Sequence, residues 1–331
     1  MTLVSVVVIG RNEGARLESC LRSVNAMLRK DFTTEVIYVD SGSTDESLSL
    51  AQRLGARTIP LKATRPTAAL GRNAGWRAAR GEFVLFLDGD TILHPDFVRL
   101  ALPHFAVPAH AVLWGHRREL HPQASVYNRV LDLDWIYPPG LTRFCGGDAL
   151  FRTEILVQTQ GFDETLIAGE EPELCRRILA DGGEILHLDL PMTGHDLAMT
   201  RFAQYWKRAI RAGHAFAEVS ARFDRTPNPF WLAEARRNRS HALCLLTIPV
   251  AALTASLILR SPSPLIVAAS LLLLLAIRTT WKARWKSADR FALALYGIHS
   301  HFQRIPIYLG QLRFQRSQRT GERPALVEYK D

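Results

Sequence analysis

The sequence of 331 residues contains only four cysteines, and their positions exclude the common cysteine-based sites. Cys20, Cys145, Cys175 and Cys244 form no CxxC pair, and no histidine lies near them at zinc-finger spacing. We therefore expect no structural zinc site and a reducing compartment. The N-terminus lacks the basic segment and small-residue cleavage site of a signal peptide, so we expect it to form a first strand.

Several nucleotide-binding and hydrolase motifs are missing as well. The loop IGRNEG has two glycines but no GxGxxG, and the sequence has no GxxxxGK[ST], HExxH, GxSxG or kinase signature. These absences exclude a dinucleotide fingerprint, a P-loop and the familiar protease and kinase sites. The net charge of +9 suits an anionic partner. Because the basic, aromatic-containing stretches lie mainly beside apolar segments, we expect membrane contact and no nucleic-acid partner.

Up to about residue 190, short apolar runs alternate with helical patterns. The runs SVVVIG, EVIYVD and FVLFLD are apolar on both faces, and the segments between them have helical periodicity. This pattern predicts an α/β domain with a mostly parallel sheet that is flanked by helices. Ligands bind such sheets outside the carboxyl ends of the strands. The polar residues that follow each run are therefore candidate site residues.

The run Phe83–Leu87 ends in two carboxylates, Asp88 and Asp90, that are separated by one glycine. Residues two apart in an extended chain point the same way, so both acids can face one ligand. Carboxylates with open coordination positions suit Mg²⁺ or Mn²⁺ together with substrate phosphates. The alternative is a polar exit from the strand in which Asp90 caps the next turn. The triplet alone does not decide between the two.

Two apolar segments follow the alternating region. Residues 242–259 carry no charge and are long enough for a bilayer span, and residues 265–277 follow after the turn RSPSP. Basic clusters at 236–239 and 278–286 flank the pair, so we expect a transmembrane hairpin with both flanks on the cytoplasmic side. The alternative is a buried helical hairpin in a soluble domain. Whether residues 265–277 cross the bilayer fully stays open.

The order of the N-terminal motifs resembles family 2 glycosyltransferases of the GT-A fold. The resemblance covers roughly residues 3–190 and is carried in order by SVVVIGRNEGARLESCLRSV, EVIYVDSGSTDESLSLA, GRNAGWRAARGEFVLFLDGDTILHPDF, CGGDALFRTEI with GFDE, and GEEPELCRRIL. It implies an inverting glycosyltransferase that takes a sugar from a nucleotide-diphosphate donor with help from Mn²⁺ or Mg²⁺. A site beside a membrane hairpin favours a lipid-linked or surface-glycan acceptor.

The resemblance also implies roles for individual residues. It places the nucleoside beside the first loop and the ends of the second and fourth strands, with a basic residue nearby; these positions are Arg11, Asn12, Glu13, Asp40, Arg72 and Asp88. Asp90 would bind the metal between the two phosphates. Gly146, Gly147 and Asp148 match the segment that lines the sugar and acceptor pocket. Each of these residues also has a purely structural interpretation, as a surface charge or a turn former.

The segment GEEPELC carries the expected catalytic base. Family members usually have Glu-Asp at positions 170–171, and the aspartate deprotonates the acceptor hydroxyl; here Glu171 stands in its place and Glu170 precedes it. Acids at a helix start are also favoured by the helix dipole alone, and Pro172 marks such a start. Further along, His195 either completes the metal's coordination or is structural. Lys207 and Arg208 either bind the diphosphate or lie at the membrane interface.

These expectations define a four-part chain. We expect a GT-A catalytic domain at residues 1–225, a basic juxtamembrane linker at 226–240, two apolar membrane segments at 241–278 and a basic amphipathic region at 279–331. The protein would be integral to the cell membrane, with its catalytic domain on the cytoplasmic side. The alternatives are a nucleotidyltransferase of similar fold and a non-catalytic membrane protein that binds nucleotide sugars.

Overall fold

The computed structural model describes residues 1–227 and 229–321 and divides the chain into two compact units. The first unit comprises residues 1–121 and 135–197. The second comprises residues 122–134 and the chain from residue 198 onward. The chain therefore enters the second unit twice, and the expected catalytic domain of residues 1–225 includes parts of both units. The last ten residues of the expected amphipathic region, 322–331, lie outside the described residues.

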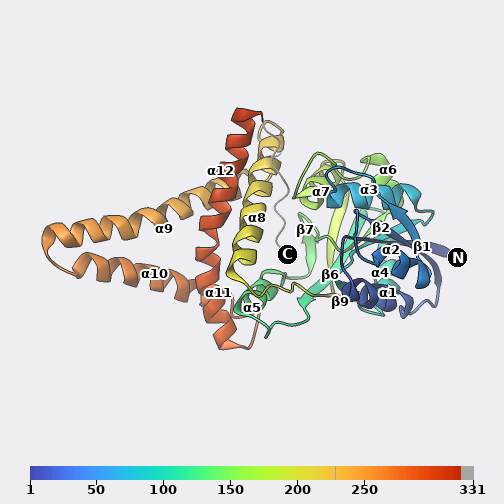
Figure 1. Cartoon of the computed structure of the whole chain (residues 1–331), viewed down its shortest axis with the longest axis horizontal. Helices are drawn as coiled ribbons and strands as arrows, with labels where there is room; N and C mark the ends of the chain where they lie inside the picture. The colour runs from blue at the N-terminus through green and yellow to red at the C-terminus, as the bar shows by residue number, and fades with distance from the viewer. Residues whose placement is uncertain (228, 322–331) are drawn as a thin grey trace. The chain divides into compact units, whose positions relative to one another are not determined.

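The first unit is built on one nine-stranded sheet with the order β3-β2-β1-β4-β8-β6-β9-β5, and β7 pairs with β9 (Figure 1). The strands are β1 Thr2–Gly10, β2 Phe32–Asp40, β3 Arg57–Pro60, β4 Phe83–Asp88, β5 Thr91–Leu93, β6 His110–Glu119, β7 Gly140–Thr142, β8 Ala149–Arg152 and β9 Glu184–His195. The three pairs among β3, β2, β1 and β4 are parallel, as the alternating sequence predicts. The other half is mixed, because β8 inserts antiparallel between β4 and β6.

Helices flank this sheet. They are α1 Ala15–Asn25, α2 Ser47–Arg53, α3 Ala68–Ala78, α4 Phe97–Ala101, the 3₁₀ helix η1 Leu102–Ala106, α6 Thr153–Gln158 and α7 Glu170–Ala180. The strands that they cover are buried on both faces: Val6, Leu85 and Phe86 are fully inaccessible. Gly75 brings α3 close to the sheet, since a Cβ there would lie 2.2 Å from Cγ1 of Val7. This close approach fixes the position of α3 and of the site residue Arg72 that it carries.

In the second unit, the regular secondary structure of the described residues is all helical. It contains α5 Val126–Asp134, α8 Phe202–Phe223, α9 Leu232–Leu259, α10 Ser263–Lys282, α11 Arg290–Phe302 and α12 Arg304–Thr320. α9 and α10 form a long hairpin that extends away from α8, α11 and α12 (Figure 1). Much of the expected juxtamembrane linker is helical, because α9 begins at Leu232. α11 and α12 are separated at Gln303, and Pro306 occupies the first turn of α12.

Both hairpin helices are long and apolar enough to cross a membrane, and few residues of their most apolar segments are buried (17% and 6%). Their exposed side chains are large and aliphatic along the whole length, as Val250, Leu257 and Leu274 illustrate. A helix in the core of a soluble unit would bury such side chains. The exposure therefore favours the membrane interpretation over the buried hairpin.

Candidate functional site

The parallel register brings the predicted polar clusters to one edge of the sheet. Gly10 at the end of β1 pairs with Asp40 at the end of β2, and Ile9 pairs with Asp88 at the end of β4. The first two loops are also bonded to each other, because the Asn12 amide donates to Ser43 Oγ at 2.9 Å and Asn12 Oδ1 accepts from the Thr44 amide at 2.8 Å. The polar residues that follow the three apolar runs in the sequence are therefore close together in space.

Asp40 organises the second loop. Its carboxylate accepts hydrogen bonds from the amides of Gly42 and Ser43 and from the Tyr38 hydroxyl, and its side chain is buried. By contrast, Arg11 is exposed, and Glu13 is half-buried and paired with Arg16 at 3.0 Å. Arg11 thus reaches solvent from the first loop, while Asp40 holds the second loop in shape.

Arg72 is a fully buried cation inside a cluster of acids. Its guanidinium lies 2.9 Å from Asp88, 2.9 Å from Glu170 and 3.2 Å from Glu171, and only 2% of its side chain is exposed. These contacts explain how an apolar strand can end in a carboxylate, because a buried charge is tolerated when it is paired and hydrogen-bonded. They also engage Arg72 with protein carboxylates, which favours a positioning role over direct contact with a nucleotide.

Glu171 has the properties of a proton acceptor. Burial and the negative charge of Glu170 raise the pKa of Glu171 to about 7, although Arg72 opposes the shift. Its side chain is still 19% exposed, so a ligand can reach it. The next acid on α7, Glu173, is instead bonded to Arg177 within the helix at 2.7 Å. α7 thus presents one carboxylate that titrates near neutral pH, which is the condition for general base catalysis.

The glycine pair after β7 packs against this cluster. A Cβ on Gly147 would lie 2.6 Å from Arg72 Nη2, 2.9 Å from Asp88 Oδ2 and 3.2 Å from Glu171 Oε1. A Cβ on Gly146 would meet only Arg117, at 3.9 Å. The two glycines therefore differ: Gly147 is small because the acids and the arginine occupy the adjoining space.

Asp148 ties the ends of two strands together. Its Oδ1 accepts from the backbone amide of Asp88 at 3.0 Å, and its Oδ2 accepts from the Thr193 hydroxyl at 2.8 Å. It is 3% exposed. The residue expected to line the sugar pocket thus also holds β4 against β9.

Asp90 and His195 lie together, as the metal hypothesis requires. His195 Nε2 is 3.2 Å from Asp90 Oδ2, and both side chains are almost fully buried. The antiparallel pairing of β5 with β9 places them there, because Thr91 is directly opposite His195. Within the described ranges, no three His, Cys, Asp or Glu side chains form a metal-binding group. A carboxylate and an imidazole nevertheless suit Mn²⁺ or Mg²⁺ that takes its other ligands from substrate phosphates and water.

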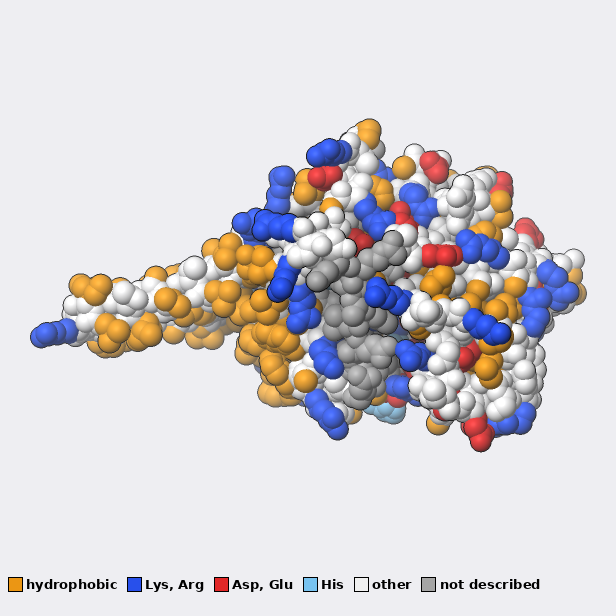
Figure 2. Space-filling model, turned by 45° about the horizontal axis from the view of Figure 1, so that its top comes forward, with side chains coloured by type: hydrophobic (Ala, Val, Ile, Leu, Met, Phe, Trp, Pro, Cys, Tyr) orange, Lys and Arg blue, Asp and Glu red, His pale blue; other side chains and the backbone are white. Residues whose placement is uncertain are grey.

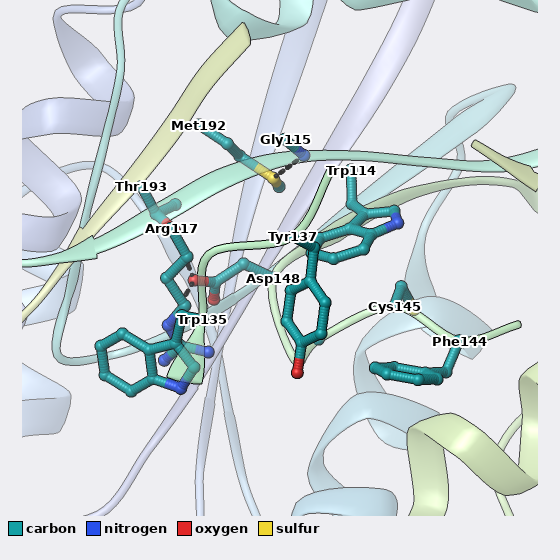
Figure 3. A pocket seen from close by; sticks show the side chains of 11 residues that line it. Trp114, Gly115, Arg117, Trp135, Tyr137, Phe144, Cys145, Asp148, Met192 and Thr193 are labelled. Carbon is teal, nitrogen blue, oxygen red and sulfur yellow. Dashed lines mark hydrogen bonds and ion pairs between the residues drawn. The ribbon is translucent and has the colours of Figure 1, made fainter. Parts of the chain in front are cut away.

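A cavity of about 110 Å³ lies in the same unit, between the side chains drawn in Figure 3. Gly146, Asp148 and Thr193 line it, and aromatic and apolar side chains supply most of the remaining wall: Trp114, Trp135, Tyr137, Phe144, Cys145 and Met192. The expected sugar and acceptor segment 146–148 therefore borders a real cavity. Its aromatic wall suits the C–H faces of a sugar or an apolar substituent.

Arg117 and Trp135, which the sequence motifs do not predict as site residues, also line this cavity. The Arg117 guanidinium stacks on the Trp135 ring at 4.9 Å and lies 3.6 Å from Asp88 and 3.8 Å from Asp148. The Trp135 ring also contacts the His195 ring at 5.0 Å. The pair connects the cavity to the Asp90–His195 site. No local motif marks them, since Arg117 lies in an ordinary strand and Trp135 follows an excursion into the other unit.

Lys207 and Arg208 lie on α8 of the second unit, where Lys207 is exposed and Arg208 half-buried. Their expected contact with the diphosphate stays a prediction.

The sheet, its acidic edge and the adjoining cavity define a nucleotide-sugar transferase fold of the GT-A type. Residues 5–155 match the family model described as "Glycosyl transferase family 2". This part of the chain is therefore similar to family 2 glycosyltransferases.

Three comparisons illustrate the breadth of the likeness. The mannosyltransferase PcManGT from Pyrobaculum calidifontis, solved in complex with GDP-Man and Mn²⁺, superposes with a TM-score of 0.64 at 21% identity over 93% of this chain and 86% of that chain. The pre-mycofactocin glycosyltransferase of Mycobacterium tuberculosis is 26% identical over 209 residues, which is 58% of this chain and 42% of that protein. Glucosyl-3-phosphoglycerate synthase of the same organism is 35% identical over 102 residues, or 29% and 31% of the two chains. The chain thus spans less than half of these curated relatives.

Proposed function

We propose that the protein is an inverting glycosyltransferase that moves a sugar from a nucleotide-diphosphate donor to a membrane-associated acceptor. The observation that carries the proposal is Glu171: a reachable carboxylate with a pKa of about 7, held beside the acidic end of β4 and the glycine segment that borders the cavity. The family match and the relatives that use nucleotide sugars support the reaction class.

In this mechanism Glu171 removes the proton from the acceptor hydroxyl. The acceptor oxygen attacks the anomeric carbon as the bond from that carbon to the diphosphate oxygen breaks, and the nucleoside diphosphate leaves. A single displacement from the opposite face inverts the configuration. General base catalysis of this kind typically contributes 10²–10⁴-fold. Arg72 holds Glu171 in position through their 3.2 Å ion pair.

The donor would lie along the carboxyl edge of the sheet. In this proposal Arg11, Asn12 and Glu13 would face the nucleoside and Asp88 the ribose, while Asp40 fixes the shape of the adjoining loop. Asp90 and His195 would hold a divalent metal, and that ion would neutralise charge on the leaving diphosphate. Arg117 supplies a second cation at the same place, since its guanidinium lies over Trp135 within the cavity wall.

The membrane-associated acceptor and the cytoplasmic orientation rest on the second unit. Its hairpin exposes apolar side chains, and the residues from 236 to 286 include eight lysines and arginines but no aspartate or glutamate. Positive charge concentrated at one end of a hairpin favours the cytoplasmic side for that end. Extraction of membranes at alkaline pH tests this part: an integral protein stays in the pellet, whereas recovery in the supernatant would contradict it.

The reaction is tested with the purified full chain and a panel of UDP-, GDP- and dTDP-sugars, with and without Mn²⁺ or Mg²⁺. We expect metal-dependent release of nucleoside diphosphate from one donor. Asp90→Asn should abolish turnover, and Glu171→Gln should reduce it by about 10²–10⁴-fold while the variant still binds the donor. Glu154→Gln, an exposed acid on α6, is the matched control and should keep full activity.

Other outcomes identify the alternatives. Formation of inorganic diphosphate from a nucleoside triphosphate and a sugar phosphate would indicate a nucleotidyltransferase. Tight binding of a nucleotide without any turnover, in the presence of membrane lipids as acceptors, would indicate a binding protein. Full activity in the Glu171→Gln variant would reject the assigned base.

A further inference from the structure

The helices α11 and α12 carry an exposed apolar stripe that the transfer reaction does not use. Apolar residues recur there at intervals of three or four, and we call them the outer stripe: Phe291, Leu295, Ile298, Phe302, Ile305, Leu309 and Leu312. This spacing places all of them on one face of a helix. Phe291 and Ile298 are each 59% exposed, and Leu309 is 38% exposed. The stripe therefore offers apolar surface on both helices.

The stripe continues across the junction between the two helices. Gln303 separates them, but its backbone keeps the right-handed helical conformation (φ −59°, ψ −18°). The Ile307 amide donates to the Gln303 carbonyl at 3.1 Å, whereas Pro306 has no amide hydrogen to donate to the Phe302 carbonyl. The helical phase is largely preserved, so the apolar residues before and after the junction lie on the same side.

The opposite face of these helices packs within the second unit. Leu293, Ile307 and Phe314 are at most 8% exposed, and Gly310 brings α12 into backbone contact with α8. A helix that is docked on a soluble unit typically buries one such face and exposes polar side chains on the other. α11 and α12 instead have apolar side chains on both faces. The outer stripe is thus additional to the packing surface.

Aromatic residues of α8 extend the stripe. The rings of Phe202 and Trp206 lie 6.2 Å and 5.9 Å from the ring of Phe302, and 5.4 Å from each other. Phe202 is 48% exposed. At the base of the hairpin, Trp281 and Trp285 are also exposed. Tryptophan is enriched where membrane lipids meet water, because its ring is amphipathic.

The charge along α11 and α12 is of one sign. Between residues 290 and 320 the sequence has five arginines and neither aspartate nor glutamate. Arg313, Arg316 and Arg319 are exposed and follow the last residue of the stripe. Helices that lie in the surface of a membrane with anionic lipids combine an apolar face with basic residues in this way. The charge therefore favours a lipid surface as the partner of the stripe.

The hairpin supplies the continuity with a membrane. α11 packs on α10 and α12 packs on α9, so both helices lie at the base of the hairpin. The hairpin projects sideways from them (Figure 1), and hydrophobic side chains cover it and continue at its base among lysines and arginines (Figure 2). A hairpin that crosses the bilayer therefore leaves α11 and α12 along the bilayer surface.

We propose that α11 and α12 lie in the surface of the membrane, with the outer stripe inserted among the lipids and the arginines beside anionic headgroups. Helices of this kind insert their apolar face by roughly 5–10 Å and do not span the bilayer. The proposal rests on the proposed membrane placement of the hairpin, but not on the transfer reaction. It gives the second unit two kinds of membrane contact, a spanning hairpin and a pair of surface helices.

Fluorescent labels at single cysteines test this proposal in the full chain. Cys244 on α9 is exposed and the other three cysteines are buried, so the parent protein is labelled at the hairpin. In a Cys244→Ser background, Ile298→Cys and Leu309→Cys place the label on the stripe, once on each helix. Gln315→Cys is the matched control, because Gln315 is exposed on α12 but lies off the stripe. An unchanged Tm in detergent shows that each labelled variant keeps the fold.

The labelled proteins are reconstituted into vesicles of phosphatidylcholine and phosphatidylglycerol. Lipids with a nitroxide near the headgroup end of the acyl chain quench labels in the interface, and iodide quenches labels in water. We expect several-fold stronger lipid quenching at positions 298 and 309 than at 315, and several-fold weaker iodide quenching. Equal values at all three positions would overturn the proposal. Protection from iodide without lipid quenching would indicate a second copy of the chain over the stripe and would also overturn it.

The label at Cys244 separates failure of this proposal from failure of the hairpin's placement. Lipid quenching at Cys244 but not at positions 298 and 309 would show that the hairpin enters the bilayer while α11 and α12 stay outside it, which would overturn the surface placement alone. Absence of lipid quenching at Cys244 as well would contradict the membrane placement of the whole unit. Neither result would bear on the transfer reaction, which is measured by nucleoside diphosphate release.

Discussion

The chemistry of the first unit depends on how one buried arginine is shared among acids. Arg72 pairs with Asp88, Glu170 and Glu171. Gly147 packs against Arg72, Asp88 and Glu171. Three carboxylates around one guanidinium cannot all be fully neutralised, so one of them retains a proton more tightly than usual. That acid is Glu171, whose side chain is 19% exposed.

The first prediction concerns the pH dependence of catalysis. Because the pKa of Glu171 is raised to about 7, the protonated, inactive form accumulates below that pH. We expect kcat/KM to fall roughly tenfold per pH unit in the acid limb and to level off above the pKa. Glu171→Gln should reduce turnover by about 10²–10⁴-fold and abolish this limb. A variant that kept the same acid limb would show that another group is responsible.

The same shift makes a prediction about stability. A carboxyl whose folded pKa is higher than its unfolded pKa stabilises the protein below the unfolded value, and this stability is lost as pH rises through the folded value. The window for Glu171 therefore runs from about 4.5 to about 7. Glu171→Gln should raise the free energy of unfolding by on the order of 2 kcal/mol at pH 8 and have little effect near pH 5. Thermal unfolding at both pH values measures it; an equal effect at both would contradict the linkage.

The two adjacent glycines offer a matched pair. Gly147→Ala would force a methyl group to within 2.6 Å of Arg72 Nη2, whereas Gly146→Ala would meet only Arg117 at 3.9 Å. We expect the first to displace the Arg72–Glu171 pair and reduce kcat by about 10²-fold, since small displacements at a reacting centre have effects of this size. The second should stay close to the parent enzyme. Equal activities in an assay of nucleoside diphosphate release would show that the cluster tolerates the displacement.

At the scale of elements, the helices of the second unit cross at glycines. A Cβ on Gly213 of α8 would lie 1.9 Å from the Ile307 carbonyl oxygen, and one on Gly310 of α12 would lie 2.0 Å from that of Ile210. The backbones of α8 and α12 are thus in direct contact. Small residues permit such approach in membrane-associated helices as well as in soluble ones.

This contact reverses the usual effect of a glycine-to-alanine change. In a free helix the change stabilises by about 0.5–1 kcal/mol. For Gly310→Ala we expect a loss of about 1–3 kcal/mol, because the helices must separate to admit the methyl group. Gln315→Ala on the exposed side of the same helix is the control and should be neutral or slightly stabilising. An increase in the Tm of Gly310→Ala would contradict the observed crossing.

At the scale of the whole molecule, the chain is not a catalytic domain followed by an appendage. α5 interrupts the first unit between residues 121 and 135 and belongs to the helical unit, where it packs on α11 and where Asp134 is bonded to His299. Residue Trp135 of the cavity is joined by one peptide bond to this helix. The boundary expected at residue 225 would therefore cut α5 away from its partners.

A chain that ends after residue 225 tests this arrangement. It keeps α5 but loses α11 and His299, so we expect a lower Tm and binding of a hydrophobic dye to the uncovered face of α5. The control is the full chain with residues 243–277 replaced by a flexible linker. This control keeps both α5 and α11. A truncated chain as stable as that control would show that α5 folds without the helical unit.

The sequence by itself determined the strands, the edge at which they end and the identity of the acids. β-branched runs with a helical pattern between them predict a sheet, and in a parallel pair the two ends lie side by side, so Asp40 and Asp88 could be assigned to one edge. The two apolar segments could also be predicted, because a long uncharged run is a local property of the sequence. The order of the N-terminal motifs indicated the resemblance to the family.

Only the tertiary structure decided how these groups act on one another. The burial of Arg72 among three carboxylates joins residues that are far apart in sequence, and no local pattern encodes it. The same holds for Arg117 over Trp135 and for Gly147 against the acids. Electrostatic shifts and packing depend on distance and desolvation, and these are set when the elements come together rather than by the order of residues in the chain.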